Sequence, residues 1–465
     1  MKNKTIRDFA NYALGDLFVK GFLFISLPLL SRILSPEQYG KLSIINTAIM
    51  ILYVFISLNL QNAVTNRYML TKEKFNDYSK TILCFLFPFQ LLLLCLSPFF
   101  SKTVSRLLGI DSNDFYWVMI ICMMLSYLYI YTCYLQASRQ SSAYVKINVV
   151  SKISEIILIF IFAYLMTHQQ YMSKIYAQII VTSIILVFLL RPFSRLTNGT
   201  FNYSYLKEAL LFSVPLIVHV LSNSLLSQAD RIIINDLLGP SAAGIYSFSY
   251  NLGAGILVLI MAWNSSWQPR LYKYIEEDNV EKIRAITKAS TILIFIATGL
   301  AIVFSKEIIL LIADESYYSG IKVLPTIIIG NSVIHLYLTY VNFIFYKKRS
   351  FLISSATLLA VIINIGLNYL LIPKYGIAGS AWATVISYIL LAIFHYITST
   401  FISRNNSISY RYIVYFLSGL LSVYALTLYV ESELSFVLTV IVKIFAALLM
   451  ASVVIKLKVY KELSE

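Results

Sequence analysis

The feature that most constrains this chain is a succession of apolar runs, each about 20 residues long. An α-helix of that length crosses the hydrocarbon core of a bilayer, which is about 30 Å thick. Hydrophobic residues make up 59% of the 465 residues and charged residues only 13%, whereas a soluble domain has about 25% charged residues. Backbone polar groups must be satisfied inside lipid, and the runs do not alternate as barrel strands would, so we expect helices.

The chain is therefore predicted to be an all-α polytopic membrane protein with about 14 transmembrane helices. The longest connection, 267–288, is charged and is interpreted as a surface helix lying along the membrane. The expected spans are 13–34, 42–65, 81–100, 116–136, 147–167, 175–193, 208–235, 244–265, 289–311, 323–345, 351–372, 379–400, 412–430 and 436–455.

Basic residues predict the orientation of these spans. The first tail and the loops on its side hold 25 of the 37 Lys and Arg residues. The opposite loops hold 6, namely Lys41, Lys102, Arg106, Lys174, Lys322 and Lys374. The positive-inside rule then predicts that both termini lie in the cytoplasm. The same distribution accounts for the net charge of +15 without a nucleic-acid partner.

The N-terminal region and the cysteines exclude two further readings. Asp16 and Lys20 interrupt the first apolar run, so it is not a removable signal peptide. The cysteines all lie in apolar runs without metal-ligand spacing, so neither a metal site nor a disulfide is predicted. They are Cys84, Cys95, Cys122 and Cys133.

A short pattern occurs twice, in RILSPEQYGKLS (32–43) and DLLGPSAAGIYS (236–247). The two segments match at Leu34 and Leu238, Pro36 and Pro240, Gly40 and Gly244, and Ser43 and Ser247. Each lies at the turn before an even-numbered span, and the six spans between them give both copies the same direction. Such repeats are related by a pseudo-twofold axis along the membrane normal. The predicted domains are an N-lobe of six helices (1–205), a C-lobe of six helices (206–400), and helices 13 and 14 with a cytoplasmic tail (401–465).

Polar side chains recur at helical spacing inside the apolar spans. A charge within a span is costly, so each ionisable residue there is a candidate for function. Hydrogen bonding between helices is the alternative explanation for each stripe. Stripes on spans two, five, seven and ten favour one hydrated cavity between the lobes. The candidates are Asp16, Lys20, Asn62, Lys152, Glu155, His219, Asn223, Asp230, Arg231 and His335.

Three junctions of the chain resemble those of bacterial polysaccharide flippases. They are RILSPEQYGKLS, SVPLI followed by DRIIINDLLGPSAAGIYS, and LIPKYGIAGSAWATVISY (371–388). The resemblance covers residues 1 to about 400 in pattern and is to the multidrug/oligosaccharidyl-lipid/polysaccharide (MOP) exporter superfamily, especially its O-antigen repeat-unit flippases.

This resemblance implies a transporter and not an enzyme. It would move undecaprenyl-diphosphate-linked oligosaccharide from the cytoplasmic to the periplasmic leaflet by alternating access. Implied partners are that glycan, membrane lipids and the polysaccharide polymerase machinery, without a cofactor; coupling to H⁺ or Na⁺ stays open. The substrate-binding candidates are Lys20, Lys152, Arg231, Asn62, Asn223 and His335. The ion-pair or coupling candidates are Asp16, Glu155, Asp230 and His219.

Two other functions are alternatives to this one. A multidrug or cation antiporter of the same superfamily would favour acidic cavity residues, whereas Lys and Arg at least equal Asp and Glu within these spans. A membrane-embedded glycosyltransferase or polysaccharide polymerase needs an acidic catalytic loop or a sizeable outer domain, and the outer loops here are short. The identity of the glycan and the oligomeric state are not encoded in any pattern of the sequence.

Overall fold

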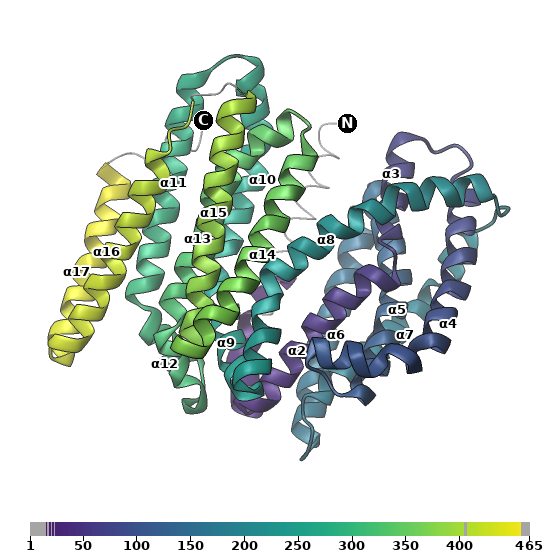
Figure 1. Ribbon diagram of the computed structural model, residues 1–465, viewed down its shortest axis with the longest axis horizontal. Helices are drawn as coiled ribbons and strands as arrows, with labels where there is room; N and C mark the ends of the chain where they lie inside the picture. The colour runs from purple at the N-terminus through teal and green to yellow at the C-terminus, as the bar shows by residue number, and fades with distance from the viewer. Residues whose placement is uncertain (1–14, 16–17, 20, 23, 404–406, 457–465) are drawn as a thin grey trace. The chain divides into compact units, whose positions relative to one another are not determined.

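All regular structure is helical in the part of the chain that the computed structural model describes (Figure 1). The described residues are 15, 18–19, 21–22, 24–403 and 407–456. They divide into two compact units, Met1–Gly244 and Ile245–Glu465. The predicted all-α polytopic class is therefore confirmed.

The first unit contains α2 (Pro36–Ile56), α3 (Leu60–Leu70), α4 (Phe75–Leu108), α5 (Ser112–Ala137), α6 (Ser141–Leu165), α7 (Met172–Leu196) and α8 (Tyr203–Leu238). Helix α9 (Pro240–Gly253) contains the boundary between the units. The second unit contains α10 (Gly255–Glu276), α11 (Val280–Val303), α12 (Ser305–Ile312), the 3₁₀ helix η1 (Glu315–Lys322), α13 (Leu324–Tyr346), α14 (Ser350–Tyr375), α15 (Ile377–Ser403), α16 (Arg411–Glu433) and α17 (Phe436–Lys456).

Eleven helices of the described chain are long and apolar enough to span a membrane. A twelfth span arises if α9 and α10, which meet at a bend of 40°, are counted together. Two shorter apolar helices, Phe24–Ile33 and Phe436–Ser452, lie within the predicted first and last spans. The number of 14 spans stays a prediction. So does the division at residue 205, although α8 packs against α2, α3 and α4 in the first unit.

The predicted second span is not one helix, which corrects the expectation for 42–65. Helix α2 ends at Ile56 and α3 begins at Leu60. Leu58 and Asn59 between them have φ angles of 47° and 57°, in the left-handed region. A break at this depth must satisfy the backbone groups that the helix no longer pairs.

Two side chains bond backbone groups at the break, and the Asn59 side chain is itself held by neighbouring amides. The Asn59 amide donates to the Ser57 hydroxyl at 3.1 Å. Gln90 of α4 donates to the carbonyl of Ile56 at 3.3 Å. The Asn59 carboxamide oxygen accepts from Asn62 at 2.7 Å and from Gln61 at 2.9 Å. The amides of span two therefore stabilise a discontinuous helix, which a pattern of helical spacing does not reveal.

The predicted surface helix at 267–288 is also wrong. Helix α10 continues without interruption to Glu276, and α11 begins at Val280. Asn279 starts α11 by accepting a hydrogen bond from the Lys282 amide at 3.1 Å. The charged residues lie on the ends of these two helices, which a short turn joins. A run of charged residues is equally compatible with a helix end and with a separate surface helix, so the sequence pattern did not distinguish the two.

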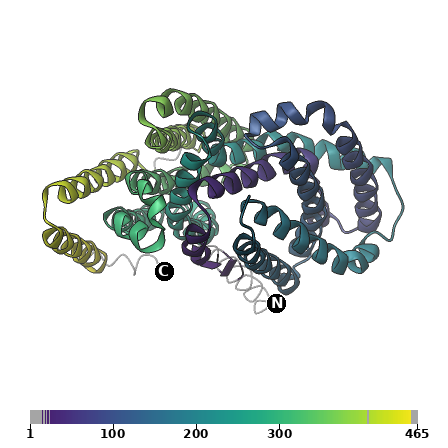
Figure 2. The ribbon, with the colours of Figure 1, turned by 90° about the horizontal axis from the view of Figure 1, so that it is seen from below.

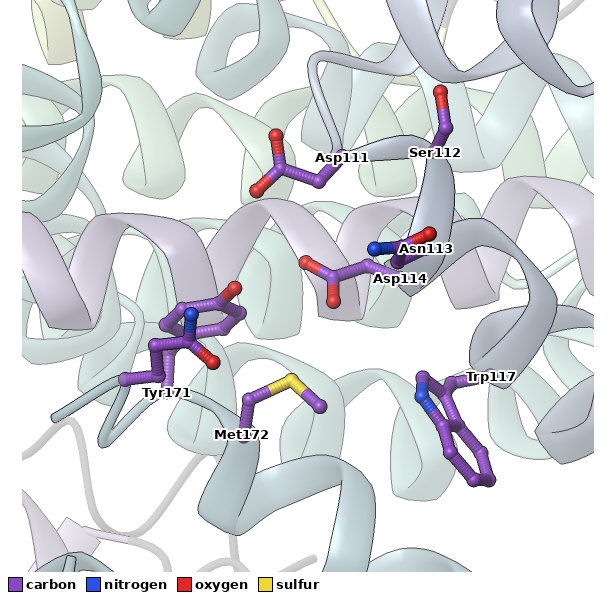
Figure 3. A pocket seen from close by; sticks show the side chains of 8 residues that line it. Asp111, Ser112, Asn113, Asp114, Trp117, Tyr171 and Met172 are labelled. Carbon is purple, nitrogen blue, oxygen red and sulfur yellow. The ribbon is translucent and has the colours of Figure 1, made fainter.

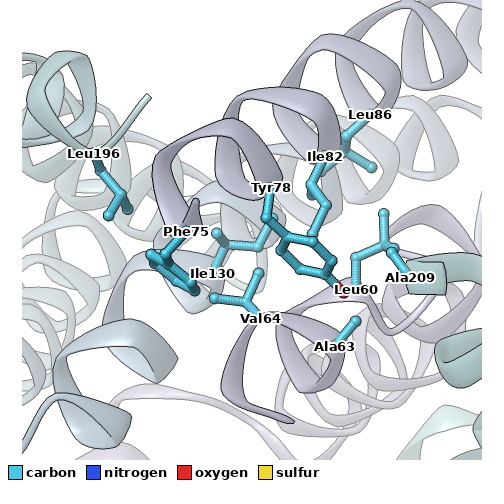
Figure 4. Packing of buried hydrophobic residues seen from close by; sticks show 10 residues of the cluster. All are labelled: Leu60, Ala63, Val64, Phe75, Tyr78, Ile82, Leu86, Ile130, Leu196 and Ala209. Carbon is cyan, nitrogen blue, oxygen red and sulfur yellow. The ribbon is translucent and has the colours of Figure 1, made fainter. Parts of the chain in front are cut away.

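The short helix α3 is held in a cluster of buried apolar residues (Figure 4). The members are Leu60, Ala63, Val64, Phe75, Tyr78, Ile82, Leu86, Ile130, Leu196 and Ala209. Beside it, the Arg67 guanidinium lies 5.4 Å from the ring centre of Tyr78 and 5.1 Å from that of Tyr205, and it pairs with Glu208 at 3.1 Å. Packing and charge together fix the end of the broken span.

The two copies of the repeated turn contact each other within the first unit. A Cβ atom on Gly40 would overlap the carbonyl group of Pro240, and a Cβ on Gly244 would overlap that of Pro36. Pro36 and Gly40 are the residues that the repeat equates with Pro240 and Gly244. Such reciprocity is the property of a contact related by twofold symmetry.

Helices α16 and α17 form a hairpin that packs on α11 (Figures 1 and 2). Lys443 on α17 is buried and lies 2.5 Å from a carboxylate oxygen of Glu431 on α16 and 2.8 Å from one of Glu307 on α12. A lone ammonium at this position would be costly in lipid. The two carboxylates offset that cost and join the hairpin to the rest of the second unit.

Candidate substrate-binding site

A cluster of three charges joins α6 and α7. These helices are neighbours connected by a short turn, in which Gln170 donates to the carbonyl of Ala163 at 2.9 Å. Lys152 and Glu155 lie three residues apart on α6 and form an ion pair at 3.1 Å. Lys174, in the first turn of α7, forms a second ion pair with the same Glu155 carboxylate.

Exposure distinguishes the two lysines of this cluster. The Lys174 and Glu155 side chains are 11% and 5% exposed, whereas the Lys152 side chain is 37% exposed. An ammonium group has three donors, and two lysines around one glutamate carry a formal surplus of one positive charge when both are protonated. Lys152 is thus the member of the cluster that can reach an anion outside it.

The pair Asp230–Arg231 lies on α8 and is enclosed by protein. The two residues are 2% and 7% exposed, and the Arg231 amide donates to the Asp230 carboxylate at 2.8 Å. One turn earlier, Gln228 lies 3.4 Å from the Thr47 hydroxyl of α2. The predicted role of Arg231 in binding stays a prediction; its position is at a packed helix contact of the first unit.

The rest of the α8 stripe is more accessible. Asn223 is exposed, and its amide lies 3.3 Å from His219 Nε2 and 3.2 Å from the His219 carbonyl oxygen. Ser227 continues the row by donating to the Asn223 carbonyl at 3.1 Å. These bonds run along one face of α8, and the predicted binding role of Asn223 and His219 stays a prediction.

The predicted residue of span ten lies in the second unit. His335 on α13 is 2% exposed, and its Nε2 atom lies 3.2 Å from the Thr291 hydroxyl of α11. Asn342 on the same helix donates to Asn264 of α10 at 2.8 Å. This stripe makes hydrogen bonds between helices, which is the alternative that the sequence left open; whether it also faces water stays a prediction.

The remaining candidates fall into two groups. Asn62 donates to the Asn59 side chain at the helix break described above, and it is partly buried there. Asp16 and Lys20 lie outside the described residues. Within the first unit, the structure therefore brings Lys152 and Glu155 together, adds Lys174 to them, and places Asp230 and Arg231 on α8.

Comparison with known proteins identifies the family. The chain matches the family described as polysaccharide biosynthesis protein over residues 5–275, which is more than half of its length. The chain belongs to this family.

Two relatives match this family member over most of its length. A probable low-salt glycan biosynthesis flippase of Haloferax volcanii is 22% identical over 424 residues, covering 86% of this chain and 84% of the relative. A protein of Haemophilus influenzae named "Lsg locus putative protein 1" is 23% identical over 399 residues, covering 81% of this chain and 95% of the relative.

Comparison with solved structures identifies the fold of this family member. A lipid II flippase, MurJ, in an inward closed conformation matches with a TM-score of 0.68 and 15% identity, covering 95% of this chain and 98% of that one. An inward-facing multidrug resistance MATE family transporter of the MOP superfamily matches with a TM-score of 0.59 and 13% identity, covering 92% and 100%. The fold is that of MOP transporters, as the three junctions of the sequence indicated.

Sequence reasoning does not identify one residue of the charge cluster as a candidate site residue. Lys174 was assigned to an outer loop, but it lies in the first turn of α7 and is buried. The sequence signal was its position at the start of an apolar run, where a lysine side chain can reach back into the protein. Only the packing of α6 against α7 shows that Glu155 is its partner.

Proposed function

We propose that this member of the polysaccharide biosynthesis family is a flippase for a lipid-linked glycan. Its substrate would be undecaprenyl-diphosphate-linked repeat units of O-antigen or a similar surface polysaccharide, moved from the cytoplasmic to the periplasmic leaflet of the inner membrane. The family, the flippase named among its relatives and the fold shared with the lipid II flippase support the proposal.

The observation that carries the proposal is the surplus positive charge of the cluster Lys152–Glu155–Lys174. A diphosphate would compete with Glu155 for the Lys152 ammonium. Lys174 would then keep Glu155 paired, so no carboxylate is left buried without a cation while substrate is bound. After release, Glu155 pairs with Lys152 again, which makes the site reversible.

Other parts of the proposed mechanism rest on the predicted two-lobe architecture. The lobes would rock about a central site, open first to the cytoplasm and then to the periplasm. Arg231 would assist in anion binding, with Asp230 offsetting its charge when no substrate is present. Coupling to H⁺ or Na⁺ and handover to a polysaccharide polymerase are further parts of the proposal.

A second candidate is a multidrug antiporter, since the fold also matches MATE transporters. A site for cationic drugs would need surplus negative charge. The α6–α7 cluster has surplus positive charge instead, because two ammonium groups share one carboxylate. The described charge cluster therefore favours an anionic substrate.

The decisive experiment uses cells whose own copy of the gene is deleted. The double variant Lys152→Ala/Arg231→Ala should abolish surface polysaccharide, while the lipid-linked repeat unit accumulates where an impermeant glycan-oxidising label reaches it only after the cells are opened. Lys273→Ala is the matched control, because the Lys273 side chain is 69% exposed and pairs only at a distance of 3.6 Å with Glu277.

Normal glycan export by the double variant, at wild-type amounts of inserted protein, would remove these residues from the mechanism. Drug susceptibility measured in the same strains separates the two candidate functions. Increased susceptibility to cationic drugs with unchanged polysaccharide would favour the antiporter and contradict the flippase.

A further inference from the structure

A second polar site lies at the N-terminal ends of α5 and α7, and none of the three charged residues of the α6–α7 cluster lines it. It is a cavity of about 460 Å³, within the range of about 300–1,000 Å³ typical of ligand pockets (Figure 3). Its walls come from the start of α5 and from the connection that leads into α7. The lining residues are Asp111, Ser112, Asn113, Asp114, Trp117, Gln169, Tyr171 and Met172.

The lining is divided into an apolar side and a hydrogen-bonding side. Trp117 is a wall residue, and 39% of this large aromatic residue is exposed. Met172 adds a buried thioether. Figure 3 shows the Asp111 and Asp114 carboxylates and the Asn113 carboxamide around the same space as these two side chains. A ligand that fits must itself have an apolar face and a polar edge.

The floor of the cavity is buried and bonded to neighbouring elements. Asp114 is 6% exposed and Tyr171 is 5% exposed, and the two share a side-chain hydrogen bond. The Tyr171 amide donates to the carboxamide oxygen of Gln38 at 3.1 Å, and the Lys41 ammonium lies 5.7 Å from the Tyr171 ring centre. Gln38 and Lys41 belong to the first turns of α2, so the repeated turn of the fold supports this cavity.

The phenol of Tyr171 acts as a donor here. Burial raises the pKa of Tyr171, and the negative charges of Asp114 and Asp111 raise it further. The phenol therefore stays protonated throughout the physiological range and occupies one acceptor position of Asp114. The rim carboxylate of Asp111 and the amides of Asn113 and Gln169 have exposed side chains that a ligand can reach.

We propose that this cavity binds one neutral or amino sugar ring of the transported glycan, with the apolar face of the ring against Trp117 and its hydroxyl groups donating to Asp111 and Asp114. Indole rings offer a flat apolar surface, and ionised carboxylates accept strong hydrogen bonds from hydroxyl groups. The inference rests on the proposed flippase function and adds a saccharide site to it.

The carboxylates of this cavity favour a different part of the substrate from the part that the lysines of the α6–α7 cluster favour. Two carboxylates repel a diphosphate and acidic sugars, whereas the Lys152 cluster attracts them. The basic-residue distribution predicts that the connections 109–111 and 166–171 lie on the outer side. The cavity would therefore hold the sugar end of the substrate on the periplasmic side while the diphosphate is still engaged deeper in the protein.

A divalent cation is the other occupant that two carboxylates suggest. Calcium takes 6–8 oxygen ligands at about 2.3–2.6 Å, a shell much smaller than this cavity and without use for an indole wall. No group of three or more metal-ligating side chains (His, Cys, Asp or Glu) occurs in the described part of the chain. The amphipathic lining thus favours the sugar ring.

The test measures tryptophan fluorescence of the purified full-length chain in lipid nanodiscs. The probes are glucose, galactose, rhamnose, N-acetylglucosamine, N-acetylgalactosamine and glucosamine, each titrated to molar excess, with glucuronate and calcium chloride as contrasting ligands. At least one neutral or amino sugar should change the emission saturably, and Trp117→Phe should remove that change. The matched control Trp382→Phe, which alters a tryptophan of the second unit, should retain it.

Two further variants test the hydrogen-bonding side. Asp114→Asn should weaken sugar binding on the order of tenfold, as expected for loss of a charge-assisted hydrogen bond. Asn113→Ala, on the exposed rim, gives a second measurement if the Asp114 variant fails to fold. No saturable change with any of the six sugars, or the same change with calcium chloride alone, would overturn the proposal.

The outcomes separate this inference from the proposed function. Sugar binding is measured in the purified protein, whereas flipping is tested by glycan export in cells. Loss of export in the Lys152/Arg231 double variant without any sugar binding would refute the cavity alone. Saturable sugar binding together with normal export in that variant would instead support the cavity and contradict the mechanism proposed for the charge cluster.

Discussion

At the scale of single residues, Lys174 shows how one side chain sets the charge of a site. Glu155 is shared between Lys152 and Lys174, and only Lys152 is substantially exposed. The buried lysine neutralises the glutamate and leaves the exposed lysine available. The Lys174 ammonium, which does not contact substrate, can therefore determine how strongly the Lys152 ammonium attracts an anionic substrate.

We predict that Lys174→Met lowers glycan flipping in reconstituted vesicles, because Lys152 then becomes the sole partner of Glu155 and the surplus charge is lost. Lys174→Arg should restore part of the activity. Removing one member of a buried pair destabilises a protein by about 3–5 kcal/mol, so thermal unfolding is measured alongside. The double variant Lys174→Met/Glu155→Gln should recover stability and flipping together; flipping unchanged in Lys174→Met would contradict this role.

At the scale of helices, the reciprocal glycine contact explains why the repeated turn carries glycine twice. Gly40 and Gly244 each lie against the backbone of the opposite copy, where no side chain can move aside. A methyl group at either position must displace a whole helix end. The repeat is therefore a requirement of close packing as well as a trace of duplication.

Gly40→Ala and Gly244→Ala should each lower the unfolding temperature of the detergent-purified protein, by an amount that corresponds to overpacking of about 1–3 kcal/mol. Gly366→Ala is the matched control, since an added Cβ there meets no atom within 4 Å. Alanine in that helix should be neutral or slightly stabilising. Equal unfolding temperatures for all three variants would show that the turns separate easily.

The C-terminal hairpin offers a second test at the same scale. Lys443→Ala should loosen α17 from α12 and α16, because Glu307 and Glu431 then lose their shared cation. Limited proteolysis of the purified protein should cut the connection between α16 and α17 faster than in wild type. Lys456→Ala, at the end of the same helix, is the comparison; an identical cleavage rate in both variants would argue that apolar packing alone holds the hairpin.

At the scale of the whole molecule, orientation in the membrane is the property that the charge distribution predicts. Reporter fusions in the turns 71–74, 197–202 and 277–279 should behave as cytoplasmic, and a fusion after Asp111 as periplasmic. A periplasmic signal from the turn 197–202 would overturn the two-lobe scheme. It would also move the sugar cavity to the wrong side of the membrane.

The sequence by itself determined the helical class, the approximate positions of the spans, the resemblance to MOP flippases and the repeated turn. These properties are local, because each membrane helix satisfies its own backbone and its apolar length can be counted residue by residue. Lys152 and Glu155 were found in the same way, since residues three apart on a helix are neighbours whatever the fold.

Only the tertiary structure decided which side chains meet across helices. The pairing of Lys174 with Glu155, the break at Asn59 that Gln90 stabilises, and the cavity between Trp117 and Tyr171 all join distant parts of the chain. Each depends on how two helices are rotated and shifted against one another. Successive residues of a helix point in directions about 100° apart, so the rotation of the helix about its axis decides which side chains face a neighbour. Packing of the whole unit selects that rotation, and the spacing within one segment does not.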